Sequence, residues 1–299
     1  METIGFIGMG LMGHGMARNI IEKGYALTMM GHRNRKPVED LIQRGASEVT
    51  SPKDVAARSS IIFICVTGSA EVEAVIRGPQ GLAAGAKPGS IIVDCSTSDP
   101  TSTLKLAEEL AAQGIILVDA PLSRTPKEAW EGTLDTMVGC TDEVFVRLKP
   151  VLDTWAGRVV HVGGTGDGHK MKLINNFIAM GYASLYSEAL ALAQKTGITP
   201  QRFDNVIRGG RMDCGFYQTF MSYVLERNRD AHKFTLQNGF KDMRYLEAMA
   251  DAAGMANPIG NAVKNSFAMA VNAGKGQDYV PMLSDAIAEI NGVSLVPKS

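Results

Sequence analysis

Short apolar runs alternate with helical patterns along the first half of the chain. The first run, Thr3–Gly8, precedes a stretch of helical spacing over Met12–Lys23. Further apolar runs lie at Ala26–Met30, Ile61–Val66, Ile91–Asp94 and Ile115–Asp119, and closing strands are expected at Thr136–Gly139 and Val159–Val162, with a helix over Glu143–Lys149 between them. Because buried strands separated by helices are typical of parallel sheets covered on both faces, the pattern predicts an α/β domain with a doubly wound, mostly parallel sheet.

The pattern changes after Gly164–Gly168. From about His169 to Lys195 the chain has helix formers and no proline, and no alternating strand pattern follows. Further helical stretches are expected near Pro200–Val206, Phe216–Glu226, Leu236–Ala253, Pro258–Ala273 and Pro281–Ile290. The sequence therefore predicts two domains, an α/β domain over residues 1–163 and an all-helical (all-α) domain over residues 164–299.

Composition excludes several functional classes. The 299 residues are 45% hydrophobic and 20% charged, with a net charge of −1, which is typical of a globular protein without a nucleic-acid partner. No apolar run approaches the roughly 18 to 20 residues of a membrane span, and no signal peptide is recognisable. The cysteines form no CxxC pair, so we expect a reducing compartment, the cytoplasm, and no metal. The histidines His14, His161, His169 and His232 have no partner at metal-ligand spacing and are interpreted as structural or surface residues.

A glycine motif follows the first predicted strand. It has the form GxGxxG and comprises Gly8, Met9, Gly10, Leu11, Met12 and Gly13. In a strand-to-helix turn such glycines allow a tight bend and close approach of the backbone to a pyrophosphate, whose charge the helix N-terminus stabilises. The alternative is a turn with three incidental glycines. The alternating pattern downstream favours dinucleotide binding.

The end of the second predicted strand bears on the choice of cofactor. An NAD-type site would place an acid about twenty residues after the motif, to hold the ribose hydroxyls. That position falls near Gly31, which is followed by a cationic stretch without an acid. Arg33, closest to the strand end, is the candidate for binding a 2′-phosphate, so NADP is favoured over NAD. Arg35 and Lys36 are equally well explained as a solvated basic loop.

Three polar residues share one face of the long predicted helix. Lys172, Asn175 and Asn176 are spaced by three and four residues, so their side chains converge. An ammonium and two amides among apolar neighbours would be costly to bury unpaired, which favours an anionic or hydroxylated ligand. A solvent-exposed lysine beside locally bonded asparagines is the alternative.

At this point the sequence resembles the β-hydroxyacid dehydrogenases, the family of 3-hydroxyisobutyrate dehydrogenase. The resemblance covers nearly the whole chain, at Gly8–Asn19, Asp94–Thr97, Asp119–Pro121, Gly132–Thr133, Gly166–Asn176 and Lys241–Asp242. It implies a Rossmann domain, a helical domain with the subunit contacts of a homodimer or homotetramer, and an active site between them. It also implies that Lys172 is catalytic and Asn176 positions it. Lys241 would lie near the nicotinamide, and Val66 and Thr97 near the cofactor.

The loop after Asp119 departs from the family pattern. Relatives have Ser-Gly-Gly where this chain has Ser123, Arg124 and Thr125. An arginine can form a bidentate pair with a carboxylate, sulfonate or phosphate. The loop residues Ser123, Arg124 and Thr125, together with Asn175 of the long helix, are the candidates for substrate binding. A surface ion pair is the alternative for Arg124.

The pair Arg124–Thr125 is similar to the corresponding residues in the sulfolactaldehyde reductase branch of the family. The cationic segment after Met30 and the apolar Ala179 depart from that branch. A second departure, at Arg208 and Arg211, has no assigned role.

The resemblance implies an NAD(P)-dependent dehydrogenase or semialdehyde reductase for a short anionic 3-hydroxy acid or its aldehyde. Lys172 would act as general acid and base, because a lysine whose pKa is lowered by desolvation can serve both directions. A reductase for a sulfonated C3 aldehyde is one alternative. A non-catalytic dinucleotide-binding module is another, and the intact Lys172, Asn175 and Asn176 argue against it. An imine-reducing relative usually has another residue at the lysine position.

Overall fold

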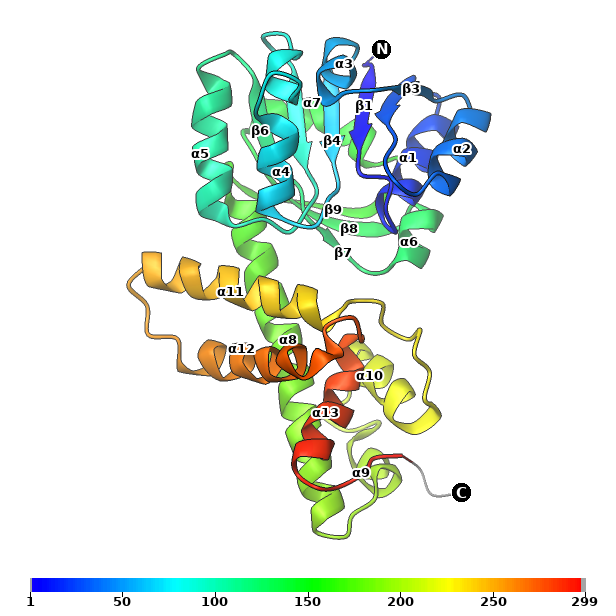
Figure 1. Cartoon of the computed structure of the whole chain (residues 1–299), viewed down its shortest axis with the longest axis vertical. Coiled ribbons are helices and arrows are strands. Elements are labelled where there is room, and N and C mark those ends of the chain that lie inside the picture. Colours follow the sequence, from blue (N-terminus) through cyan, green and yellow to red (C-terminus); the bar gives the residue numbers. More distant parts are fainter. Residues whose placement is uncertain (1, 297–299) are drawn as a thin grey trace. The chain divides into compact units, whose positions relative to one another are not determined.

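The computed structural model describes residues 2–296 and divides into two compact units. The first extends to Lys172 and the second begins at Leu173. Both are shown in Figure 1. Each unit has its own hydrophobic core.

The first unit is built on a single sheet of nine strands, in the order β3-β2-β1-β4-β5-β6-β8-β7, with β9 paired to β8. The first six strands of this order pair in parallel, whereas β8 runs antiparallel to both β6 and β7. The strands are β1 (Ile4–Ile7), β2 (Leu27–Met30), β3 (Ser47–Val49), β4 (Ile61–Ile64), β5 (Ile91–Asp94), β6 (Ile116–Asp119), β7 (Leu122–Ser123), β8 (Leu134–Gly139) and β9 (Ala156–Gly163).

Helices cover both faces of this sheet, which explains why its central strands are apolar throughout. Alternate residues of β4 belong to different hydrophobic clusters. Phe63 shares its cluster with residues of α1, α2, α6 and α7, and Ile62 shares its cluster with residues of α3, α4 and α5. The helices are α1 (Gly13–Glu22), α2 (Lys36–Gln43), α3 (Pro52–Ala57), α4 (Ser69–Ile76), α5 (Pro100–Ala111), α6 (Pro126–Glu131) and α7 (Asp142–Leu152), with a 3-10 turn at Leu82–Ala84.

The second unit is helical. Its core includes Tyr217, Phe220 and Phe267, which are at most 1% exposed. Its elements are the continuation of α8 (Asp167–Lys195), α9 (Pro200–Ile207), α10 (Gly215–Glu226), α11 (Leu236–Ala252), α12 (Pro258–Ala270) and α13 (Leu283–Ile290), with a π turn at Val271–Lys275 and a 3-10 turn at Val280–Met282.

The expected fold class, a doubly wound Rossmann sheet followed by a helical part, is confirmed. Two strands were not predicted. β3 has three residues, of which Ser47 and Glu48 are exposed, and β7 has only two, so neither has an apolar pattern. The helix expected to reach Ala273 ends at Ala270, because the π turn that follows contains Gly274 at a φ of +80°.

Candidate active site

The glycine motif forms the turn between β1 and α1. Gly8 has a φ of +101°, and a Cβ there would lie 2.1 Å from the carbonyl oxygen of Cys65, so only glycine fits. A Cβ at Gly10 would meet nothing within 4 Å, and Leu11 is 68% exposed. The N-cap residue of α1, Met12, makes no side-chain capping bond. The turn therefore offers open backbone and the uncapped N-terminus of α1, beginning at Gly13, to an anionic group.

The loops after β4 and β5 lie beside this turn, because β1, β4 and β5 are neighbours in the sheet. A Cβ on Gly8 would be 3.3 Å from Val66 Cγ1. The amide of Val66 donates to Ser96 Oγ at 3.0 Å, which places Val66 next to the loop containing Thr97. Met9, by contrast, is buried in the core, so only its backbone is available to a ligand. These positions fit a dinucleotide at the carboxyl edge of a parallel sheet.

An acid that was not predicted from the sequence lies beside the end of β2. Glu48 of β3 lies beside Gly31 and accepts bidentate bonds from Arg35 at 2.6 and 2.9 Å. The guanidinium of Arg35 holds the pKa of the Glu48 carboxyl below its usual range. Arg33 is exposed, and within residues 2–296 it has no ion-pair partner. Arg35 is therefore engaged locally, whereas Arg33 is not.

The predicted substrate loop begins on β7. Ser123 Oγ is buried and has no hydrogen-bond partner in the described part of the chain. Arg124 adopts a φ of +83°, and its Nε lies 3.1 Å from Asp135 Oδ1 of β8, although without hydrogen-bond geometry. Its side chain is 49% exposed. The surface ion pair considered for Arg124 thus exists, next to an unpartnered buried hydroxyl.

Thr125, the third residue of this loop, caps α6. Its hydroxyl accepts from the amide of Lys127 at 3.3 Å, and Glu128 accepts from the amide of Thr125 at 3.0 Å. Thr125 and Glu128 form a capping box. The Thr125 hydroxyl therefore has a structural role, which substrate binding would have to share.

A buried carboxylate holds the start of α8. Asp119, at the end of β6, accepts backbone amides of Gly166 and His169, each at 2.7 Å. A Cβ on Gly168 would lie 2.5 Å from the carbonyl oxygen of Met137 and 2.8 Å from that of Asp119, so the helix approaches the sheet closely only because residue 168 is glycine. Burial raises the pKa of the Asp119 carboxyl above its usual range, while His169 and the two backbone bonds act in the opposite direction. Lys172, one turn later, is partly buried.

Asn176 is held by Asp242, a contact that was not predicted from the sequence. Its amide nitrogen donates to Asp242 Oδ2 at 2.6 Å, and Asp242 is fully buried. Lys241 Nζ lies 3.1 Å from the other carboxylate oxygen. Asn175 is partly buried on the same helix as Lys172 and Asn176. The adjacency of Lys241 and Asp242 was visible in the sequence, but their pairing with Asn176 depends on tertiary structure.

Comparison with known families matches both parts of the chain. Residues 3–163 match the NAD binding domain of 6-phosphogluconate dehydrogenase, and residues 166–284 match the family described as NAD-binding of NADP-dependent 3-hydroxyisobutyrate dehydrogenase. The chain belongs to the 3-hydroxyisobutyrate dehydrogenase-like family. It is an NAD(P)-dependent oxidoreductase that acts on CH–OH groups, as the motifs implied.

Individual relatives support this 3-hydroxyisobutyrate dehydrogenase-like assignment. The 2-(hydroxymethyl)glutarate dehydrogenase of Eubacterium barkeri is 39% identical over 207 residues, covering 68% of this chain and 67% of its own. The 3-sulfolactaldehyde reductase of Escherichia coli K12 is 28% identical over 284 residues, covering 95% of each chain. The crystal structure of 3-hydroxyisobutyrate dehydrogenase from Salmonella typhimurium has a TM-score of 0.84 at 27% identity, covering 97% of this chain and 100% of that one.

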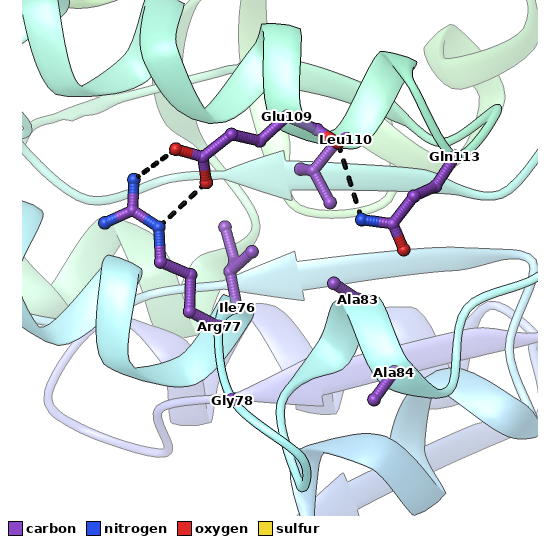
Figure 2. Close-up of a pocket in the computed structure, with 8 residues that line it drawn as sticks. All are labelled: Ile76, Arg77, Gly78, Ala83, Ala84, Glu109, Leu110 and Gln113. Carbon is purple, nitrogen blue, oxygen red and sulfur yellow. Dashed lines mark hydrogen bonds and ion pairs between the residues drawn. The ribbon is translucent and has the colours of Figure 1, made fainter.

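Other polar features of this 3-hydroxyisobutyrate dehydrogenase-like chain involve residues without a predicted role in the site. Arg77 and Glu109 form a bidentate pair at 2.8 Å and help to line a hollow of about 300 Å³, whose side chains are drawn in Figure 2. No predicted site residue lines it. Arg208 pairs with the buried Asp204 at 2.8 Å, and Arg211 is exposed. Within residues 2–296 no helix is long and apolar enough to cross a bilayer.

The conformation of Arg124 leads to a stability prediction. A side chain with positive φ is strained, and the strain disappears with glycine. We expect Arg124→Gly to be more stable than Arg124→Ala by about 1 kcal/mol in urea unfolding. Because both variants lose the ion pair with Asp135, the comparison isolates the backbone. Equal stability of the two would contradict strain at residue 124.

Proposed function

We propose that this chain transfers hydride between NADP(H) and a short anionic 3-hydroxy acid or its semialdehyde, with Lys172 as general acid and base. The observation that carries the proposal is the attachment of the first turn of α8 to Asp119. Asp119 ends a strand at the sheet edge where the glycine turn lies. Lys172, one turn into α8, belongs to the same compact unit as that turn.

The residues have separate tasks in this reaction. When bound, the nicotinamide supplies or accepts the hydride. Lys172 Nζ donates a proton to the alkoxide oxygen during reduction and takes it from the hydroxyl during oxidation, and its charge stabilises the alkoxide. Asn176, oriented by Asp242, positions the lysine and the substrate.

The substrate's anionic group would be bound by the loop after β7. Ser123 Oγ is a buried hydroxyl without a partner in residues 2–296, so it can donate to a carboxylate. Arg124 and Asn175 add a charge and an amide, and Thr125 a hydroxyl shared with its cap. A sulfonated C3 aldehyde is the second candidate, favoured by Arg124 in place of glycine and by the similarity to the sulfolactaldehyde reductase.

Turnover in a panel of C3 to C4 hydroxy acids, semialdehydes and the sulfonated aldehyde tests this function. With the preferred substrate, Lys172→Ala should lower kcat at least about a hundredfold, because the proton transfer loses its acid. Cofactor dissociation constants should stay within about twofold. The matched control is Lys170→Ala, which removes a lysine paired with Asp167 at 2.9 Å and should retain activity.

Full activity of Lys172→Ala would exclude the assigned role. Cofactor binding without turnover of any substrate in the panel would instead support a non-catalytic dinucleotide-binding module.

The preference for NADP rests on the end of β2. Both oxygens of Glu48 are engaged by Arg35, which neutralises the charge of this carboxylate. Arg33, two residues after Gly31, is exposed and would bind the 2′-phosphate.

Replacing Arg33 by alanine should weaken NADP binding about tenfold, the loss expected for one charge-assisted hydrogen bond, with NAD binding unchanged. Fluorescence titration of both nucleotides measures this. Lys36→Ala removes the same charge from the same segment and should leave the ratio of the two constants unaltered. If Arg33→Ala weakened both nucleotides equally, the phosphate-binding role would be wrong.

An apolar face of the second unit is proposed as the contact with a second copy of this chain. Exposed side chains follow one side of α8 at helical spacing: Ile174, Ile178, Tyr182, Leu185 and Leu192. Three side chains of this ridge, Ile178, Tyr182 and Leu185, also line a groove of about 570 Å³ between α8 and α12. Because ridge and groove lie on one face, two copies related by a two-fold axis can each insert the ridge into the other's groove. A homodimer, or a homotetramer built from it, follows.

Leu185 is 62% exposed at the edge of this groove. Leu185→Glu should convert the dimer to a monomer, because the interface would bury an unpaired charge. Light scattering would then give the mass of one chain, 32.0 kDa. Val206→Glu places the same charge on α9, where Val206 is 78% exposed, and should leave the mass unchanged. A wild-type mass of one chain would contradict the proposed interface.

A further inference from the structure

A buried histidine lies between two buried carboxylates at the start of α8. His169, Asp94 and Asp119 are at most 2% exposed. The two aspartates end β5 and β6 and are paired in the register of the sheet. The proposed chemistry uses none of these three side chains, yet His169 stands one helical turn before Lys172.

The imidazole of His169 is held through one nitrogen. Nδ1 lies 2.8 Å from Thr103 Oγ1 of α5. The Thr103 hydroxyl donates to the carbonyl of Asp99 at 3.2 Å, and in the tautomer with a proton on Nδ1 it accepts from that nitrogen. Nε2 has no hydrogen-bond partner in residues 2–296 and lies 3.7 Å from Asp94 Oδ2. The ring therefore connects α8 to α5 and contacts the end of β5.

Asp94 in turn organises the loop that follows β5. Its carboxylate accepts the amide of Ser96 and the hydroxyl of Ser98, both at 2.8 Å. Ser96 Oγ accepts the amide of Val66. The residue between the two serines is Thr97, a predicted cofactor contact. The loop and the first turn of α8 thus meet at the His169 ring.

We propose that His169 is a positioning residue that fixes the first turn of α8, and with it Lys172, relative to the loop that contains Thr97. The backbone of His169 is bonded to Asp119 and its side chain to Thr103, so the helix start is held on two sides. Losing the side-chain contact removes the hydrogen bond that joins the start of α8 to α5 and lets the turn shift about the Asp119 bonds. The consequence for catalysis rests on the proposed function of Lys172, whereas the structural coupling does not.

Two substitutions test this proposal. Thr103→Val removes the hydroxyl at nearly constant volume, and His169→Leu removes the ring nitrogens. Both should lower kcat by about tenfold to a hundredfold, since small displacements of a catalytic group have effects of this size, while KM and cofactor affinity change by less than about threefold. His169→Asn, which places an amide near the position of Nδ1, should recover most of the loss. His161→Leu, which removes a different, half-buried histidine of the same unit, should keep wild-type kcat.

Hydrogen exchange provides a measurement that needs no substrate. The amides of Gly166 and His169, both bonded to Asp119, should exchange at least about tenfold faster in Thr103→Val than in the wild type. If exchange accelerates and Lys172→Ala keeps full activity, the coupling holds and the role of Lys172 is wrong. If Thr103→Val folds with wild-type exchange and kcat, the proposal is overturned. A lower melting temperature with unchanged kcat overturns it as well, because that is the signature of a purely structural contact.

Discussion

The arrangement of the site depends on the hydrogen bonds that the carboxylate of Asp119 accepts from the start of α8. A buried carboxylate is costly unless hydrogen bonds replace its hydration, and here two backbone amides from the start of a 29-residue helix do so. Those amides are among the groups that a helix N-terminus leaves without partners, and the negative charge complements the helix dipole. One contact therefore satisfies both the sheet and the helix. It also determines where the following turn, with Lys172, begins.

The bonds to Asp119 require that the start of α8 lies close to the edge of the sheet. The start of α8 reaches the sheet edge only because residue 168 lacks a side chain, as a Cβ would overlap two carbonyl oxygens. The neighbouring groups, His169 and Thr103, are then brought within hydrogen-bond distance. Packing, helix capping and side-chain bonding thus support one geometry, and the same geometry orders the loop after β5 through Asp94.

The sequence predicted the features that depend on local pattern. The buried strands and the long helix have apolar runs or helical spacing of sufficient length, and the glycine motif stands in its diagnostic strand-to-helix position. Short elements such as β3 and β7 have no such pattern and were missed. The pairings of Glu48 with Arg35 and of Asp242 with Asn176 were also missed, because they join residues from separate elements. His169 was expected to be structural or on the surface, and it is fully buried; its contacts come from α5, β5 and β6.

The ion pair beside Gly31 makes the effect of a substitution at residue 31 depend on two other positions. A Cβ at Gly31 would lie 2.3 Å from Glu48 Oε1 and 2.5 Å from Arg35 Nη1, so any side chain introduced there has to displace the ends of these two flexible side chains. Substitutions at residues 31, 35 and 48 are therefore expected to be epistatic, because each changes the space or the charge that the others meet. A library that varies the three residues together would reach combinations that variation of residue 31 alone does not sample.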